Sequence, residues 1–133
     1  MRKVVLQNPV IIIILAILSI AAIARNSVWY DSLSLWKDTA AKSPEKARPH
    51  NNLGGSYELN DMSDKAMEEY KRAIAIDTFF YHSYANIGAI YLKKQEFDKA
   101  IEALSDALTL NPYQANAHNN MGLAYEFKGI FGK

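Results

Sequence analysis

Three short stretches of the sequence repeat one another and decide the fold. Residues 52–57 read NLGGSY, residues 86–91 read NIGAIY and residues 120–125 read NMGLAY. Each stretch follows the one before it by 34 residues, begins with Asn, a large apolar residue and Gly, and ends with Tyr. Agreement at several positions with one fixed spacing indicates an internal repeat whose units are single supersecondary elements. Small residues keep the same spacing further along the units: Ala66, Ala73, Ala100 and Ala107.

The repeated residue types suit two helices that pack closely against each other. Gly54 and Gly88 are small enough for a second helix to cross them, and the alanines occupy the matching positions on that second helix. Large residues such as Tyr57, Tyr70 and Leu104 fill the space between the backbones. We therefore predict an all-α chain of helix-turn-helix units. Residues that favour turns or helix ends separate the helices: Asn60 and Asp61, Gln95 and Glu96, Asn111 and Pro112, with Ser63 as an expected helix cap.

This pattern resembles the tetratricopeptide repeat, a helix-turn-helix unit with small residues at its eighth, twentieth and twenty-seventh positions and often Pro at its thirty-second. The resemblance implies a solenoid that coils into a right-handed superhelix, with units at residues 47–80, 81–114 and 115–133. The third unit would hold a first helix only. Because a repeat array needs a covered end, we expect missing C-terminal helices or another chain to cover this unit.

The same register predicts one more helix before the first unit. Ser32, Trp36 and Thr39 precede Ala66, Tyr70 and Ala73 by one repeat, and they keep the order of small, large and small residues. We therefore interpret residues 25–46 as a junction followed by the second helix of a degenerate half-repeat.

The first 24 residues differ in composition from the rest of the chain. Their only charged residues are Arg2 and Lys3, and residues 10–24 read VIIIILAILSIAAIA. As a helix, residues 4–24 would be about 32 Å long, which matches a hydrocarbon core of roughly 30 Å. We predict a transmembrane helix, or an uncleaved signal anchor, over residues 1–24, with residues 4–24 in the membrane.

Two features of this apolar segment bear on whether it is cleaved and on how it is oriented in the membrane. A basic start, an apolar stretch and the small residues of 22–24 are also the layout of a cleaved secretory signal peptide. Arg2 and Lys3 outnumber Arg25 on the other flank, which favours a cytoplasmic N-terminus. We therefore expect a single-pass membrane protein whose repeats lie on the exported side, periplasmic or extracytoplasmic.

The resemblance also places candidate binding residues, because the second, fifth and sixth unit positions commonly face the concave groove. An Asn amide offers a donor and an acceptor, so a row of Asn can pair with an extended peptide backbone. Basic residues would add affinity for acidic side chains or a terminal carboxylate. The alternative is that Asn is merely tolerated on a solvated helix face. The candidate peptide-binding residues are Arg48, Asn51, Asn52, His82, Asn86, Asn119 and Asn120.

This sequence holds only part of one known kind of tetratricopeptide site, which binds a C-terminal carboxylate. Co-chaperone tetratricopeptide domains clamp a C-terminal carboxylate with basic and Asn residues from three units. Arg48, Asn52 and Asn86 match the first part of that pattern, but Asn116 and Asn120 stand where the family has basic residues. The resemblance therefore does not imply a complete carboxylate clamp.

Composition and motifs exclude several other classes of protein. The chain has no Cys, which rules out a disulfide scaffold and a Cys-ligated zinc site. Its net charge of +1 with interleaved charges argues against nucleic-acid binding. The spacings of His50, His82 and His118 follow the repeat rather than metal geometry, and no catalytic motif occurs. We expect no enzyme activity, no metal and no cofactor.

A second resemblance concerns the junction before the repeats. Four short stretches look like the junction between the last membrane helix and the repeats in polytopic O-mannosyltransferase-like membrane proteins: residues 25–29 (RNSVW), 35–38 (LWKD), 43–44 (SP) and 52–54 (NLG). We predict a membrane-tethered scaffold that binds a peptide or protein segment in the concave groove. The alternative is the C-terminal acceptor-binding part of a membrane glycosyltransferase whose catalytic region is absent from this chain. A cleaved, exported repeat protein is the third interpretation.

Overall fold

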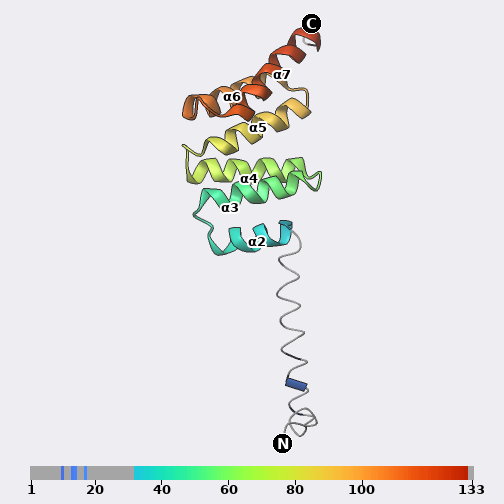
Figure 1. Cartoon of the computed structure of the whole chain (residues 1–133), viewed down its shortest axis with the longest axis vertical. Helices are drawn as coiled ribbons and strands as arrows, with labels where there is room; N and C mark the ends of the chain where they lie inside the picture. The colour runs from blue at the N-terminus through green and yellow to red at the C-terminus, as the bar shows by residue number, and fades with distance from the viewer. Residues whose placement is uncertain (1–9, 11–12, 15–16, 18–31, 132–133) are drawn as a thin grey trace, which may run out of the picture. The chain divides into compact units, whose positions relative to one another are not determined.

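The computed structural model describes residues 10, 13–14, 17 and 32–131 of the chain, and every regular element in the longest of these ranges is a helix. Helices α3 to α7 stack one after another in chain order (Figure 1). The predicted all-α solenoid is therefore confirmed for this part of the chain. The helices are α2 (Ser32–Lys42), α3 (Ala47–Glu58), α4 (Ser63–Ile76), α5 (Tyr81–Lys93), α6 (Phe97–Leu110) and α7 (Ala115–Phe131).

The predicted transmembrane helix over residues 1–24 lies almost wholly outside the described residues, and residues 25–31 of the predicted junction lie outside them too. In the part of the chain that the structure describes, no helix combines the length and the apolar character needed to cross a membrane. The chain divides into two compact units, Met1–Leu35 and Trp36–Lys133. Within the first unit, four apolar residues are helical and between 50% and 60% exposed: Val10, Ile13, Ile14 and Ile17.

The turns inside the two complete units end the first helix in the same way. Asp61 and Gln95 have φ angles of 58° and 61°, in the left-handed region that usually holds Gly. The residue after each of them donates its N–H to a carbonyl oxygen five residues back, at 2.9 Å: Met62 to Tyr57 and Glu96 to Tyr91. This is the Schellman ending of a helix, and it places both turns where the sequence predicted them.

One expected helix cap is wrong. Ser63 is the first helical residue of α4, and the capping position before it is held by Met62, which makes no side-chain capping bond. The N–H of Met62 donates to the carbonyl oxygen of Tyr57 and closes the preceding turn. Helix α4 therefore begins at Ser63 itself, one residue earlier than expected.

The turns between units are closed by short polar side chains. A carboxylate oxygen of Asp77 accepts the N–H of Phe79 at 3.0 Å, and the amide oxygen of Asn111 accepts the N–H of Tyr113 at 3.1 Å. Asp and Asn form such turns because their side chains reach the backbone two residues on. Helices α5 and α7 then start at equivalent positions of the repeat.

Two of the repeated glycines lie where helices cross. A β-carbon at Gly54 would come within 2.5 Å of the Tyr70 ring, and one at Gly88 within 2.5 Å of Leu104. The predicted close crossing is therefore confirmed in both complete units. A β-carbon at Gly122 would meet no described atom within 4 Å, because none of the helices within residues 32–131 crosses α7 at that point.

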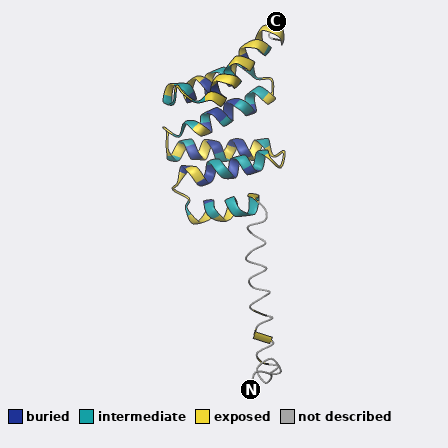
Figure 2. Ribbon diagram, in the orientation of Figure 1, coloured by how far each residue is buried: buried dark blue, intermediate teal, exposed yellow. Residues whose placement is uncertain are grey.

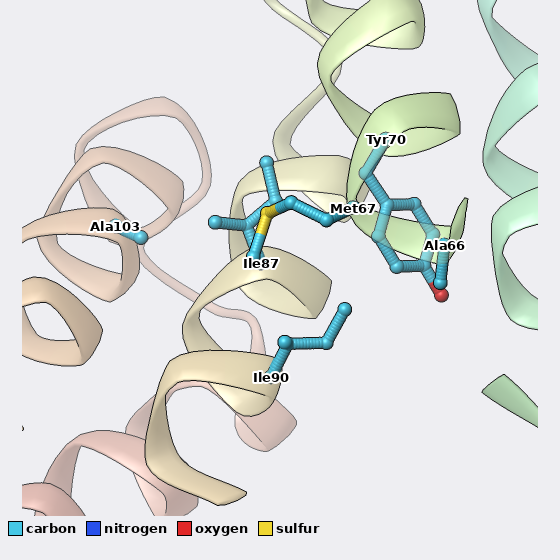
Figure 3. Close-up of a cluster of buried hydrophobic side chains, with 6 residues drawn as sticks. All are labelled: Ala66, Met67, Tyr70, Ile87, Ile90 and Ala103. Atoms are coloured by element: carbon cyan, nitrogen blue, oxygen red, sulfur yellow. The ribbon is translucent and has the colours of Figure 1, made fainter. Parts of the chain in front are cut away.

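Buried apolar side chains join each unit to the next. One cluster takes its residues from α4, α5 and α6 (Figure 3), and a second cluster continues through α5, α6 and α7. Buried residues make up the largest shares of α3 and α5, and α7 is mostly exposed (Figure 2). The core is thus a continuous strip along the stack, as expected for a solenoid. The cluster in Figure 3 consists of Ala66, Met67, Tyr70, Ile87, Ile90 and Ala103.

Candidate peptide-binding surface

The candidate residues lie on the first helices of the units, α3, α5 and α7, of which α5 contacts both of the others. We call this surface the first-helix face. The structure leaves some of the predicted side chains exposed and covers others in part. Arg48, His82 and Asn119 are exposed, whereas Asn51, Asn52, Asn86 and Asn120 are half-buried.

Asn51 is at the centre of a hydrogen-bond network that joins α3 to α5. Its amide oxygen accepts the hydroxyl of Ser83 and the amide N–H of Asn86, both at 3.0 Å. Its own amide nitrogen donates to Asn52 at 3.4 Å. Since a carbonyl oxygen has two lone pairs, both acceptor sites of Asn51 are already used. Asn51 therefore connects the two units and has no acceptor left for a peptide.

Ser83 is a functional residue of this network that the sequence interpretation missed. Its side chain is fully buried, and its hydroxyl depends on Asn51 for a partner. The available signal was its unit position, where the other two units have Pro49 and Ala117. A lone hydroxyl among apolar equivalents indicates a local polar partner.

The next junction along the stack has no such network. The positions equivalent to Asn51 and Ser83 are Ala85 and Ala117, and both alanines are buried in the second apolar cluster. Asn119 and Asn120 lie on α7, outside the network that joins the other three asparagines. The structure therefore brings together the asparagines of the first two units only.

Arg48 and His82 occupy the same unit position on neighbouring first helices. Desolvation lowers the pKa of His82 from its ordinary value of 6.5, and the charge of Arg48 lowers it further. The imidazole packs against the Tyr81 ring, with the centroids 4.1 Å apart, and against Phe80 at 5.5 Å. The arrangement presents one permanent cation beside a neutral, aromatic-supported imidazole. A carboxylate bound here would pair with Arg48 and would favour the charged form of His82.

The other two histidines hold the turns between units. The Nε2 atom of His50 lies 3.1 Å from the carbonyl oxygen of Pro44, and that of His118 lies 2.7 Å from the carbonyl oxygen of Pro112. The Nδ1 atom of His50 also lies 2.6 Å from a carboxylate oxygen of Glu69. Across residues 32–131, no three His, Cys, Asp or Glu side chains gather closely enough to hold a metal ion.

Comparisons with known proteins agree with the repeat. One family model, described as tetratricopeptide repeat, matches residues 47–79, and another, described as TPR repeat, matches residues 88–129. A crystal structure of MamA protein superposes with a TM-score of 0.68 and 31% identity, covering 76% of this chain and 55% of that one. A further MamA crystal structure gives a TM-score of 0.67 and 31% identity, with 74% and 57% covered. This chain thus spans little more than half the length of those proteins.

A third solved structure shows the fold at lower identity. It is a complex of the TPR2B domain of yeast Sti1 with pHsp70, and it gives a TM-score of 0.66 at 20% identity over 80% of this chain and 87% of that one. No curated protein matches the chain. None of these matches shows the expected likeness of the junction to O-mannosyltransferase-like proteins. The chain therefore carries tetratricopeptide repeats, over residues 47–79 and 88–129.

Proposed function

We propose that the repeats are an interaction scaffold that binds a protein or peptide segment along the first-helix face. The single observation that carries the proposal is the polar row formed by Arg48, Asn52, His82 and Asn86 on two helices in direct contact. The Sti1 domain with the same fold was solved in complex with pHsp70, which supports a protein or peptide partner.

The network changes which candidate side chains would contact a ligand. Asn51 holds Asn52 and Asn86 in place, so those two amides present their remaining donors and acceptors in a set geometry. Fixed polar groups lose less conformational freedom on binding. Arg48 adds a charge that favours acidic segments. Asn119 and Asn120 would extend the surface onto α7.

A peptide library with free C-terminal carboxylates, selected against the full chain, tests this proposal. We expect acidic peptides to be selected, and we expect the variant Arg48→Ser/Asn52→Ala/Asn86→Ala to weaken their binding at least tenfold, about 1.4 kcal/mol. Lys71→Ser is the matched control, since Lys71 is exposed on α4, away from this face. Selected peptides that bind the triple variant as tightly as the native chain would remove the site assignment.

We also propose that residues 4–24 tether the repeats to a membrane, with the repeats on the exported side. The long apolar run supports this, as do Val10, Ile13, Ile14 and Ile17, which are helical and expose apolar side chains. The intact mass of the mature chain tests the tether, because removal of residues 1–24 would contradict it. The orientation is tested by adding protease to intact cells or spheroplasts: repeats on the exported side are cleaved, and cytoplasmic repeats are not.

The glycosyltransferase alternative stays a prediction. Several further membrane segments with acidic loop residues, encoded upstream in the same reading frame, would favour it.

A further inference from the structure

A second surface of the repeats has the features of a binding groove. It lies between the second helices α4 and α6 and has α5 as its floor, and its hollow measures about 340 Å³. We call it the second-helix groove. This size falls within the range of about 300–1,000 Å³ that is common for ligand pockets. Its apolar lining includes Ile74, Tyr84, Ile87 and Tyr91, and its rim includes Glu102 and Asp106.

The groove is separate from the first-helix face. Tyr84, Ile87 and Tyr91 follow one another at helical spacings of three and four residues, so they share one face of α5. His82 and Asn86 lie on the other side of the same helix. Among the described helices, α4 and α6 both pack against α5 but are not direct neighbours of each other, so their side of the stack stays open.

Comparison with the preceding unit explains why the groove is hollow. The equivalents of Tyr84 and Ala103 are the buried His50 and the partly buried Glu69, which pair at 2.6 Å between α3 and α4. Ala103 ends at its β-carbon, and Figure 3 shows it on α6, facing α5. Replacement of the carboxylate by a methyl group removes the side chain that fills the corresponding space one unit earlier.

The rim of the groove carries uncompensated negative charge. Glu102 and Asp106 are exposed one turn apart on α6, where two like charges repel each other. Neither forms an ion pair within residues 32–131. Lys99, the cation of the rim, is paired with Glu96 and lies 5.5 Å from the centroid of the Tyr91 ring. A ligand cation would therefore meet two free carboxylates.

We propose that the second-helix groove binds a partner segment that presents an apolar side chain next to a Lys or Arg. The apolar side chain fills the hollow between the two tyrosines, above Ile74 and Ile87. The cation pairs with Glu102 and Asp106. The charge preference is opposite to that of the first-helix face, where Arg48 favours acidic segments, so one repeat array can hold two different partners. This proposal does not depend on the proposed function of the other face.

The probes are two capped dipeptides, N-acetyl-leucyl-arginine amide and N-acetyl-leucyl-glutamate amide, titrated into the isotope-labelled full chain in detergent micelles. We expect the arginine peptide to give saturable NMR shifts at Tyr84, Ile87 and Ala103. The glutamate peptide should bind about tenfold more weakly. Equal affinity for the two peptides, absence of saturable shifts at millimolar arginine peptide, or shifts centred on Asn86 would overturn the proposal.

Two variants sharpen the test. Glu102→Gln/Asp106→Asn changes only exposed side chains, and we expect it to bring the affinity for the arginine peptide down to that for the glutamate peptide. Tyr84→His/Ala103→Glu rebuilds the pair found one unit earlier and should abolish binding by filling the hollow. Glu68→Gln is the matched control, because Glu68 is the exposed equivalent of Glu102 on α4. A full loss of binding in this control, or none in the carboxylate variant, would also overturn the proposal.

Discussion

Helices α5 and α7 carry the same repeated residues but have different surroundings. Gly88 on α5 lies against the buried Leu104 of α6, whereas Gly122 on α7 has no described atom within 4 Å of an added β-carbon. Tyr91 of α5 is half-buried in the second-helix groove, and its equivalent on α7, Tyr125, is 58% exposed. The difference shows that a repeated residue type is buried only where the next helix covers it.

The register itself is the same in both regions. Lys94 pairs with Asp64 at 2.8 Å, and their equivalents Lys128 and Asp98 pair at 2.5 Å. Ala117 and Ala124 of α7 are also buried, in the second apolar cluster, where they pack with residues of α5 and α6. The contrast therefore comes from one side of α7 that none of the described helices covers, and not from a shifted helix.

Glycine substitutions give the largest expected effect. Gly88→Ala should lower the free energy of unfolding by about 1–3 kcal/mol, because the new methyl group overlaps Leu104 and approaches the carbonyl oxygen of Ala100 at 3.3 Å. Gly122→Ala should raise it by about 0.5–1 kcal/mol through helix propensity alone. Urea unfolding followed by circular dichroism measures both. Shifts of the same sign would contradict the comparison.

The second largest effect is expected where the junction of α3 with α5 is compared with the junction of α5 with α7. Asn51→Ala leaves the buried hydroxyl of Ser83 without an acceptor and should cost about 1–3 kcal/mol. Asn119→Ala, on exposed α7, should stay within about 0.5 kcal/mol. The double variant Asn51→Ala/Ser83→Ala copies the Ala85 and Ala117 junction, and we expect it to be more stable than Asn51→Ala alone. A double variant less stable than the single one would show that the network has no such role.

Substitutions in the turns inside the units should raise the free energy of unfolding and not lower it. Gln95→Gly removes the side chain from a residue at φ 61° and should stabilise the chain by up to about 1 kcal/mol. Asp61→Gly should stabilise less, because Asp tolerates the left-handed region better than Gln. Urea midpoints of the two variants test this order, and a loss of stability in Gln95→Gly would refute it.

The smallest expected effect is a shift in a titration. Since the pKa of His82 is lowered, its neutral form is favoured in the folded chain. This contribution to stability is fully present above the ordinary value of 6.5 and is lost as the pH falls from there through the lowered pKa. The ring protons of His82, followed by NMR, should titrate below that value. Arg48→Gln should move the midpoint upward without fully restoring it, because desolvation is the larger cause. Titration at or above 6.5 in the native chain would contradict this assignment.

Residue size and turn preference at a fixed spacing were sufficient to predict much of the fold. Gly54 and Gly88 marked the helix crossings, and Asp61 and Gln95 lie in the turns that were expected. The candidate site was predicted less completely. The sequence placed Asn51 and Asn86 among the candidate binding residues, but it could not distinguish an amide that joins two helices from one that is left for a ligand.

The sequence by itself determined the 34-residue period, the helix-turn-helix unit and the places where helices come closest. These depend on the size and backbone preference of single residues at a fixed spacing. Only the tertiary structure decided that Ser83 completes a polar junction and that Ala103 leaves a hollow where Glu69 fills the equivalent position. Hydrogen-bond partners and empty volume depend on side chains from several helices at once, so no single unit of the repeat contains them.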